Sequence, residues 1–285
     1  MSCITVGYTA TATGRDALNL GIALARGLDF PLTIAMVEPR DDLFGAPDTH
    51  DAGYEKIIHH QLQEWLDDAI NQVPKDISAE GVIVRACSDA EGILVAAHQA
   101  QEKHHAKTCI IVVGSRSGGL LKRMVIGSTA RELLHTADFP VALAPTGYSR
   151  QEPVSRITGM FGPRPGAVDV VSIAARIAHH RNIPLRLASL VTEEQAESID
   201  NRVRTMVGEL QHDPHVTVEL GSGATLEQAI TQLSWDDDEI LVLGSARIAP
   251  RGHLFLGRNA HHIVRHSPVP VVVIPAGTGD DSDGG

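Results

Sequence analysis

Short apolar runs rich in β-branched residues recur along the chain and alternate with longer amphipathic stretches. In the first half these runs fall near residues 3–8, 32–37, 81–86, 108–114 and 140–145, with helix-like stretches between them. A short apolar run that ends in a turn is typical of a buried strand, and strands that alternate with helices predict a parallel sheet. The first half is therefore predicted to be a doubly wound α/β domain with a five-stranded sheet.

The same arrangement of positions occurs twice. Ile110–Ser115 and Ile240–Ser245 are both apolar runs that end in Gly-Ser, and Gly114 lies 130 positions before Gly244. Four further pairs keep this offset without a gap: Gly127 and Gly257, Ala130 and Ala260, Pro140 and Pro270, and Pro145 and Pro275. An offset that is kept over so long a stretch predicts a tandem repeat of one domain.

The length of 285 residues also favours two domains, because domains typically hold roughly 50–200 residues. We predict a first domain over residues 1–147 and a second over residues 153–276. Residues 277–285 are acidic and contain no large apolar side chain, so burial would not offset the entropy lost on ordering them. This segment is predicted to be a disordered tail.

The middle of the first half is longer than that of the second. Ile4–Gly7 matches Arg156–Gly159 at an offset of 152, which exceeds the offset of 130 found further along. The excess is expected at Glu38–Gly53, which contains Pro, Gly and Asp and precedes the helix-like segment Tyr54–Gln72. Long loops of this kind are often functional.

Composition and charge narrow the classes of partner. Hydrophobic residues make up 43% of the chain and aromatic residues 4%, which suits helices packed on a parallel sheet. The formal net charge of −11 disfavours nucleic acid and anionic membranes as partners. No apolar run reaches the roughly 18 residues of a membrane span, and no secretory signal is recognisable, so a cytoplasmic protein is expected.

Metal and thiol chemistry is not predicted. Cys3, Cys87 and Cys109 lack the spacing of a metal site and lie in or beside strand-like runs, so all three are expected to be buried, reduced thiols. Adjacent histidines, as in His261-His262, point about 100° apart on a helix and do not chelate one metal as an i,i+4 pair would.

One loop carries the pattern of a phosphate site. Gly114–Thr129 leaves a strand, passes a glycine-rich turn and enters a helix at Gly127-Ser128. Glycines allow a close backbone approach, and the N–H groups at the start of a helix attract anions. Doubly wound sheets bind ligands beyond the carboxyl ends of their strands, which selects this loop and Tyr8–Gly14.

At this point the sequence resembles the universal stress protein family, and the resemblance covers nearly the whole chain, twice. ATP-binding members of that family carry Gly-x2-Gly-x9-Gly-[Ser/Thr] after the fourth strand. Gly114 matches the first glycine and Gly127-Ser128 matches the end of the motif, whereas Ser117 replaces the second glycine. Thr9 stands where those members have an acidic residue after the first strand.

The resemblance implies ATP or a related adenine nucleotide as the cofactor of the first domain, with Mg²⁺ as a companion of the nucleotide. The site residues that it implies are Val37 near the adenine, Val113 and Gly114 near the ribose, Arg116, Gly127, Ser128 and Thr129 along the phosphates, and Ser117 and Thr9 at the two departures from the pattern. No catalytic residue is implied, and an enzyme is not expected beyond slow ATP hydrolysis.

The second domain has lost most of the motif. Arg247 replaces the second glycine, Arg258 replaces the hydroxyl residue, and Pro250 removes an N–H group. Phe161 aligns with the acidic position after the first strand. ATP is therefore not expected in this half.

The final strands indicate how the halves associate. Val141–Ala144 and Val271–Ile274 are apolar and follow prolines, and they would otherwise leave exposed sheet edges. Family members pair through this strand, so the resemblance implies a pseudo-dimer within the chain and leaves a further homodimer open.

Three functions fit these patterns. The first is a stress-response protein that binds nucleotide in the first domain and acts through its conformation or a regulatory protein partner. The second is an interaction module of the same fold without nucleotide, for which Ser117 and Thr9 are the evidence. The third is a slow ATP hydrolase with Lys122 or Arg123 stabilising the leaving group.

Overall fold

The structure, a computed structural model, describes residues 2–40, 52–117, 124–162, 167–192, 207–246, 249 and 251–277. Its first half contains β1 (Ser2–Gly7), α1 (Ala12–Leu28), β2 (Leu32–Pro39), α2 (Ala52–Asn71), β3 (Ala79–Ala86), α3 (Asp89–Lys103), β4 (Thr108–Gly114), β5 (Arg116–Ser117), β6 (Met124–Val125), α4 (Ser128–Thr136) and β7 (Val141–Ala144). The five strands predicted for this half are confirmed as β1, β2, β3, β4 and β7. Most of the predicted long loop lies outside the described residues.

The second half repeats this order. It contains β8 (Arg156–Met160), α5 (Ala167–Arg181), β9 (Leu185–Thr192), the short 3₁₀ helix η3 (Gly208–His212), β10 (Val216–Gly223), α7 (Leu226–Gln232), β11 (Glu239–Gly244), α8 (Arg258–His266) and β12 (Val271–Ile274). The predicted acidic tail falls outside the described residues except for Gly277.

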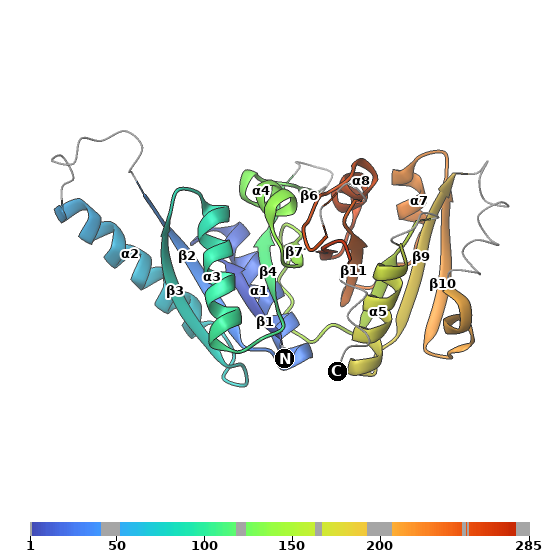
Figure 1. Ribbon diagram of the computed structural model, residues 1–285, viewed down its shortest axis with the longest axis horizontal. Helices are drawn as coiled ribbons and strands as arrows, with labels where there is room; N and C mark the ends of the chain where they lie inside the picture. The colour runs from blue at the N-terminus through green and yellow to red at the C-terminus, as the bar shows by residue number, and fades with distance from the viewer. Residues whose placement is uncertain are drawn as a thin grey trace.

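All main strands join one ten-stranded sheet in the order β10-β9-β8-β11-β12-β7-β4-β1-β2-β3. Neighbouring strands are parallel within each half, whereas β12 and β7 pair antiparallel, with Val272 opposite Ala142. Figure 1 shows this junction near the centre, between a blue-to-green half and a yellow-to-red half. The predicted intrachain pseudo-dimer through the final strands is confirmed, and the pairing covers two sheet edges. We call the β7–β12 junction the seam.

Strand register sets the equivalence of the two halves. Ile4 pairs with Leu32 across β1 and β2, and Ile157 pairs with Leu185 across β8 and β9, so the early offset is 153. The predicted match of Gly7 with Gly159 is therefore wrong by one residue. A slip of one residue in a strand would send each side chain to the opposite face of the sheet, so side-chain burial and not the glycine defines the match.

Helix α1 shows how local sequence places an element. Thr11 caps its start by accepting a hydrogen bond from the Gly14 N–H at 3.3 Å. Asp29 ends it in the left-handed conformation with φ of 54°, and its N–H donates to the Ala25 carbonyl. Leu18, Leu20 and Ile22 of this helix are buried in a core that also contains side chains of the second half.

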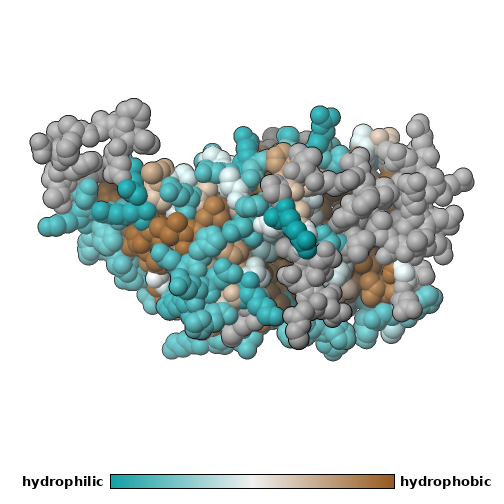
Figure 2. All heavy atoms as spheres, viewed as in Figure 1, coloured by the Kyte–Doolittle hydropathy of each residue, from teal (hydrophilic) through white to brown (hydrophobic). Residues whose placement is uncertain are grey.

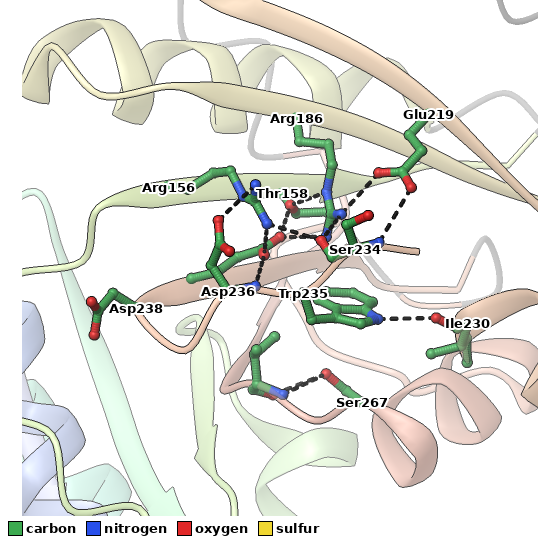
Figure 3. A network of polar contacts seen from close by, with 12 residues as sticks. Arg156, Thr158, Arg186, Glu219, Ile230, Ser234, Trp235, Asp236, Asp238 and Ser267 are labelled. Carbon is green, nitrogen blue, oxygen red and sulfur yellow. Dashed lines mark hydrogen bonds and ion pairs between the residues drawn. The ribbon is translucent and has the colours of Figure 1, made fainter. Parts of the chain in front are cut away.

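A buried ionic network fills the amino ends of the strands in the second half (Figure 3). The Glu239 carboxylate is fully buried and accepts hydrogen bonds of 2.5 Å from both Arg156 and Arg186, as well as one from Thr158. The Arg186 guanidinium also lies 4.6 Å from the centre of the Trp235 ring. Each buried charge has an opposite partner, as a low-dielectric site requires.

The equivalent place in the first half holds thiols. Cys3 and Cys109 are register partners in β1 and β4, and both are fully buried. The Thr5 hydroxyl lies 3.1 Å from the Cys109 sulfur. The hydrogen bond between Cys3 and Cys109, together with burial, raises the pKa of Cys109. The expectation of buried thiols is confirmed for these two and wrong for Cys87, which is exposed just before α3.

The face seen in Figure 2 is mostly hydrophilic, with apolar atoms gathered over β3 and the helices beside it. Helix α2 exposes Ile57 and Trp65, and α3 exposes Val95. No helix among the described residues has the length and apolar character needed to cross a membrane.

Candidate functional site

The candidate site lies at the carboxyl ends of β1 and β4, where the winding of the first half reverses. From β1 the chain proceeds outward through β2 and β3, whereas β4 is followed inward by β7. The loops after β1 and β4 therefore lie at the switch point of the sheet, which is where open α/β sheets bind their ligands. These are the two loops that the sequence selected.

Gly114 ends β4 and is needed for close packing. A Cβ atom at this position would lie 2.2 Å from the carbonyl oxygen of Thr13 in the first turn of α1. Only glycine allows the helix to approach the strand end so closely. This glycine of the motif therefore serves packing between α1 and β4, whatever it contributes to a ligand.

Arg116 lies beside the start of α4. Strand β5 turns back on β6, with Arg116 opposite Val125 and Ser117 opposite Met124, and this short ribbon was not predicted. The Arg116 side chain passes 3.8 Å from the position that a Cβ of Gly127 would occupy. A guanidinium group is thus placed next to the beginning of the helix.

The N-terminus of α4 is open. Gly127 is the N-cap residue in an extended conformation, and no side chain of the described residues caps it. Ser128 is exposed in the first helical position. The first N–H groups of a helix have no partner inside the helix, and such a helix start can bind an anion.

Thr129 has a partner that the sequence did not reveal. Its hydroxyl donates to Asp89 at 3.3 Å, and Asp89 is the first residue of α3. Ser88 caps α3 by accepting from the Glu91 N–H at 3.1 Å, so the starts of α3 and α4 lie together. The Ser-x-x-Glu capping pattern at residues 88–91 was the available signal for this helix start.

Thr9 contributes only hydroxyl chemistry. It is exposed after β1, and its hydroxyl shares a hydrogen bond of 2.9 Å with that of Thr11, the N-cap of α1. A hydroxyl can hold a ribose or base through a neutral hydrogen bond, which is roughly half as strong as the charge-assisted bond of a carboxylate.

The two predicted valines differ in position. Val113 is buried against Gly7 and Ile93, so its side chain belongs to the core and its backbone faces the crevice end of β4. Val37 lies on β2 and packs against Gly92 of α3. Strand β1 separates β2 from β4, so Val37 marks the far end of the crevice from the Arg116 side.

The second half has a cavity at the equivalent place. Its volume is about 580 Å³, and its lining is largely apolar, with Phe161, Leu243 and Phe255 among the contributors. Arg258, the first residue of α8, lies on its wall. Ser245 closes the loop beside it, because its hydroxyl donates to the Phe255 carbonyl at 3.1 Å and accepts from the Phe255 N–H.

The basic loop of this half is only partly described. Arg247 and Pro250 fall outside the described residues. By strand register the buried Phe161 is equivalent to Tyr8, so the predicted alignment of Phe161 with the acidic position is also wrong by one residue, and Gly162 stands at the place of Thr9. The geometry of this half is that of an apolar cavity with one arginine at its wall.

Comparison with known proteins agrees with this architecture. The sequence profile described as the Universal stress protein family matches residues 1–145. Universal stress proteins of Mycobacterium tuberculosis and Mycobacterium bovis are each 28% identical to the chain over 300 aligned residues, which cover 95% of this chain and 99% of the relative.

Solved structures show the same fold over the full length. A universal stress protein from Archaeoglobus fulgidus superposes with a TM-score of 0.66 at 16% identity, covering 95% of this chain and 98% of that one. A functionally unknown protein from Pseudomonas aeruginosa gives a TM-score of 0.59 at 18% identity, with 96% and 92% covered. At such identities the likeness concerns the fold alone.

Proposed function

The chain belongs to the universal stress protein family, and from this premise we propose that its first half binds ATP or a related adenine nucleotide. In this proposal the nucleotide changes the conformation of the chain or its choice of a regulatory protein partner during a cytoplasmic stress response. The observation that carries the proposal is the open N-terminus of α4 beside the guanidinium of Arg116.

The residues present suit a phosphate group. In this proposal the N–H groups at Gly127, Ser128 and Thr129, at a helix start without a side-chain cap among the described residues, supply donors together with the positive end of the helix dipole. Arg116 adds a charged, forked donor of the kind that phosphate oxygens accept best. Thr9 and the ends of β1 and β4 would hold the nucleoside.

The two departures from the motif predict moderate affinity. Ser117, which replaces the second glycine of the family pattern, is held in the β5–β6 ribbon by pairing with Met124. Thr9 offers no charge. Each change removes one favourable contact, while the donors at α4 remain.

A magnesium ion would fit beside Thr129. Mg²⁺ is usually held by one or two carboxylates together with phosphate oxygens, and it neutralises phosphate charge. The Asp89 carboxylate lies within hydrogen-bond distance of the Thr129 hydroxyl and is the group of this chain that would hold the ion. Without a cation this carboxylate would instead repel the phosphates.

We do not extend the nucleotide to the second half. Arg258 replaces the hydroxyl at the start of α8, and the apolar lining with the buried Phe161 gives a triphosphate few partners. A cavity of this volume and lining suits a compact, mostly apolar ligand. The two halves would thus respond to different molecules, or the second would serve only to complete the sheet.

A second candidate function is an interaction module without nucleotide. The exposed Ile57 and Trp65 of α2 favour it, since Ile57 is 68% exposed and Trp65 is 41% exposed. Large apolar side chains on a surface often mark a contact with a protein partner. This function and nucleotide binding are compatible in one molecule, so the experiment must address the nucleotide directly.

The test is to purify the chain, denature it and chromatograph the released small molecules. We expect about one adenine nucleotide per chain, because the proposal assigns a single site. Gly127→Val should lose the nucleotide, since the new side chain crowds the anion site, whereas the matched Gly257→Val in the second half should keep it. Absence of nucleotide from the wild type, together with no binding of added ATP, would leave the interaction module. Accumulation of ADP in the loaded protein would indicate slow hydrolysis.

A further inference from the structure

Helices α4 and α8 are the last helices of the two halves and lie on either side of the seam (Figure 1). The Leu254 N–H donates to the Ala137 carbonyl at 2.9 Å, which ties the end of α4 to the segment that precedes α8. The ring of His135 in α4 also meets Phe255 edge to face, with 5.0 Å between the ring centres. The two helices are therefore held in place by contacts between the halves.

The repeat places an Arg and a His at two matching positions, four residues apart, on each helix. Arg131 and His135 are four residues apart in α4, and the offset of 130 makes their equivalents His261 and Arg265 in α8. Residues four apart lie on one helix face. The pairs carry the same two side chains in reversed order, and all four side chains are exposed. We call these four residues the seam cluster.

The charges of the seam cluster act on one another across the seam. The pKa of His261 is lowered by its partial burial and then by positive charge on His262 and Arg265 in its own helix. Arg131 and His135 of α4 lower it further. The geometry agrees, because α8 contacts β6 of the first half and His135 of α4 contacts Phe255 of the second half.

Two carboxylates lie near the seam cluster, and both have partners outside it. Glu132 accepts from Ser88, whereas Glu227 of α7 pairs with His266 at 3.4 Å and lines the same groove as His262 and Arg265. Among the described residues Arg131 and Arg265 have no carboxylate partner. On a chain with a net charge of −11 this uncompensated basic spot is unusual.

We propose that the seam cluster binds a small oxyanion of the phosphate type that carries two or more negative charges. Two guanidinium groups can present paired donors to phosphate oxygens, and two imidazoles add donors when protonated. Repulsion among the four cations is relieved when an anion lies between them. Because each helix supplies half of the donors, the site exists only through pairing of the halves.

Binding at this site takes up a proton. An anion next to His261 favours its charged form, so affinity for the anion rises as the pH falls through the range in which histidine titrates. Uptake of one proton changes affinity by at most about tenfold per pH unit. The site is distinct from the start of α4, because His135 lies in the last turn of that helix and His261 and Arg265 belong to α8, although Arg131 is only one turn from Gly127.

The test uses the full chain with inorganic pyrophosphate as the probe and orthophosphate as a weaker anion of the same chemistry. Nuclear magnetic resonance follows the imidazole signal of His261, which is assigned because it is missing from the spectrum of His261→Asn. We expect saturating pyrophosphate to raise the pKa of His261 by about one to three pH units, and orthophosphate to raise it less. Calorimetry should show tighter binding of pyrophosphate at lower pH.

Matched variants separate the seam cluster from charge in general and from the nucleotide site. Arg131→Gln and Arg265→Gln should each weaken pyrophosphate binding about tenfold, whereas Lys107→Gln, which removes one charge from an exposed position elsewhere, should not. Gly127→Val should leave the His261 response intact. The proposal is overturned if pyrophosphate leaves the pKa of His261 unchanged, or if both arginine variants bind as well as Lys107→Gln.

Discussion

The carboxylate of Asp16 in α1 accepts a hydrogen bond of 2.8 Å from the backbone N–H of Gly147, just beyond β7. The second half repeats this bond, because Asp169 in α5 accepts one of 3.2 Å from the Gly277 N–H beyond β12. In each half the exit of the last strand is thus tied to the first helix. This hydrogen bond is present in both halves, although the sequences of their phosphate loops differ.

Asp16 gives a prediction about pH. Burial raises its pKa above the ordinary value of 3.8, while the bond from Gly147 and the charge of Arg15 oppose the rise. Because the pKa is higher in the folded state than in the unfolded state, the free energy of unfolding is highest below the unfolded-state pKa. It declines as the pH rises through the folded-state pKa. Asp16→Asn, which cannot ionise, should lack this decline. Asp16→Ala should cost about 0.5–1.5 kcal/mol through the lost bond. Urea unfolding of wild type and both variants across acidic pH checks this, and parallel curves for wild type and Asp16→Asn would refute it.

The seam should be essential to stability. Val273 of β12 lies opposite Val141 and is fully buried. Val273→Asp would bury an unpaired carboxylate at the seam and should lower the free energy of unfolding by about 3 kcal/mol or more. The same change at Val218, a strand residue that is 41% exposed, should cost less than about 1 kcal/mol. Equal losses in the two variants would mean that the halves fold without each other.

The buried ionic network should respond unequally to the loss of its two glutamates. Glu239→Ala would remove the fully buried carboxylate that Arg156 and Arg186 share, leaving them only the more exposed Asp236 and Glu219, and should destabilise the protein by about 3–5 kcal/mol. Glu219 contacts Arg186 at 2.9 Å but is partly exposed, so Glu219→Ala should cost about 1 kcal/mol. Chemical denaturation measures both. A larger loss in Glu219→Ala would contradict the assignment of Glu239 as the central anion.

Asp89 should make nucleotide affinity depend on magnesium. In the presence of a chelator, Asp89→Asn should bind ATP more tightly than wild type, because it removes a negative charge near the phosphates. With excess Mg²⁺ the advantage should vanish or reverse, since the wild-type carboxylate then holds the ion. Titration calorimetry under the two conditions checks the reversal. An unchanged ratio of the affinities would place the cation elsewhere.

Much of the fold was readable from the sequence. Apolar runs ending in Gly-Ser marked β4 and β11, and the apolar final strands, together with the family resemblance, indicated that β7 and β12 pair, but not the register that sets Val272 opposite Ala142. Strand positions are readable because burial on both faces leaves an unbroken apolar run. The equivalence of Ile4 with Ile157 was missed by one residue, because a glycine near the strand end was a weaker marker than register.

The site was less readable, because its decisive contacts join helices that are distant in the chain. The bond from Thr129 to Asp89 spans 40 positions, and nothing in either segment alone indicates that they meet. The β5–β6 ribbon places Arg116 beside Gly127, which the motif does not specify. The cavity of the second half arises from apolar side chains on several elements, so a comparison of loops alone could not reveal it.

The measurement that tests the nucleotide site most directly is calorimetric titration of the full chain with ATP and magnesium, repeated on Gly127→Val and Gly257→Val. These glycines are equivalent N-cap residues of α4 and α8 with extended backbones, and a Cβ would lie 3.8 Å from the Arg116 side chain at Gly127 and 3.2 Å from the Ala246 Cβ at Gly257. We predict about one site per chain in wild type and in Gly257→Val, and affinity reduced by about tenfold or more in Gly127→Val. Unchanged affinity in Gly127→Val, or loss of binding only in Gly257→Val, would contradict the account.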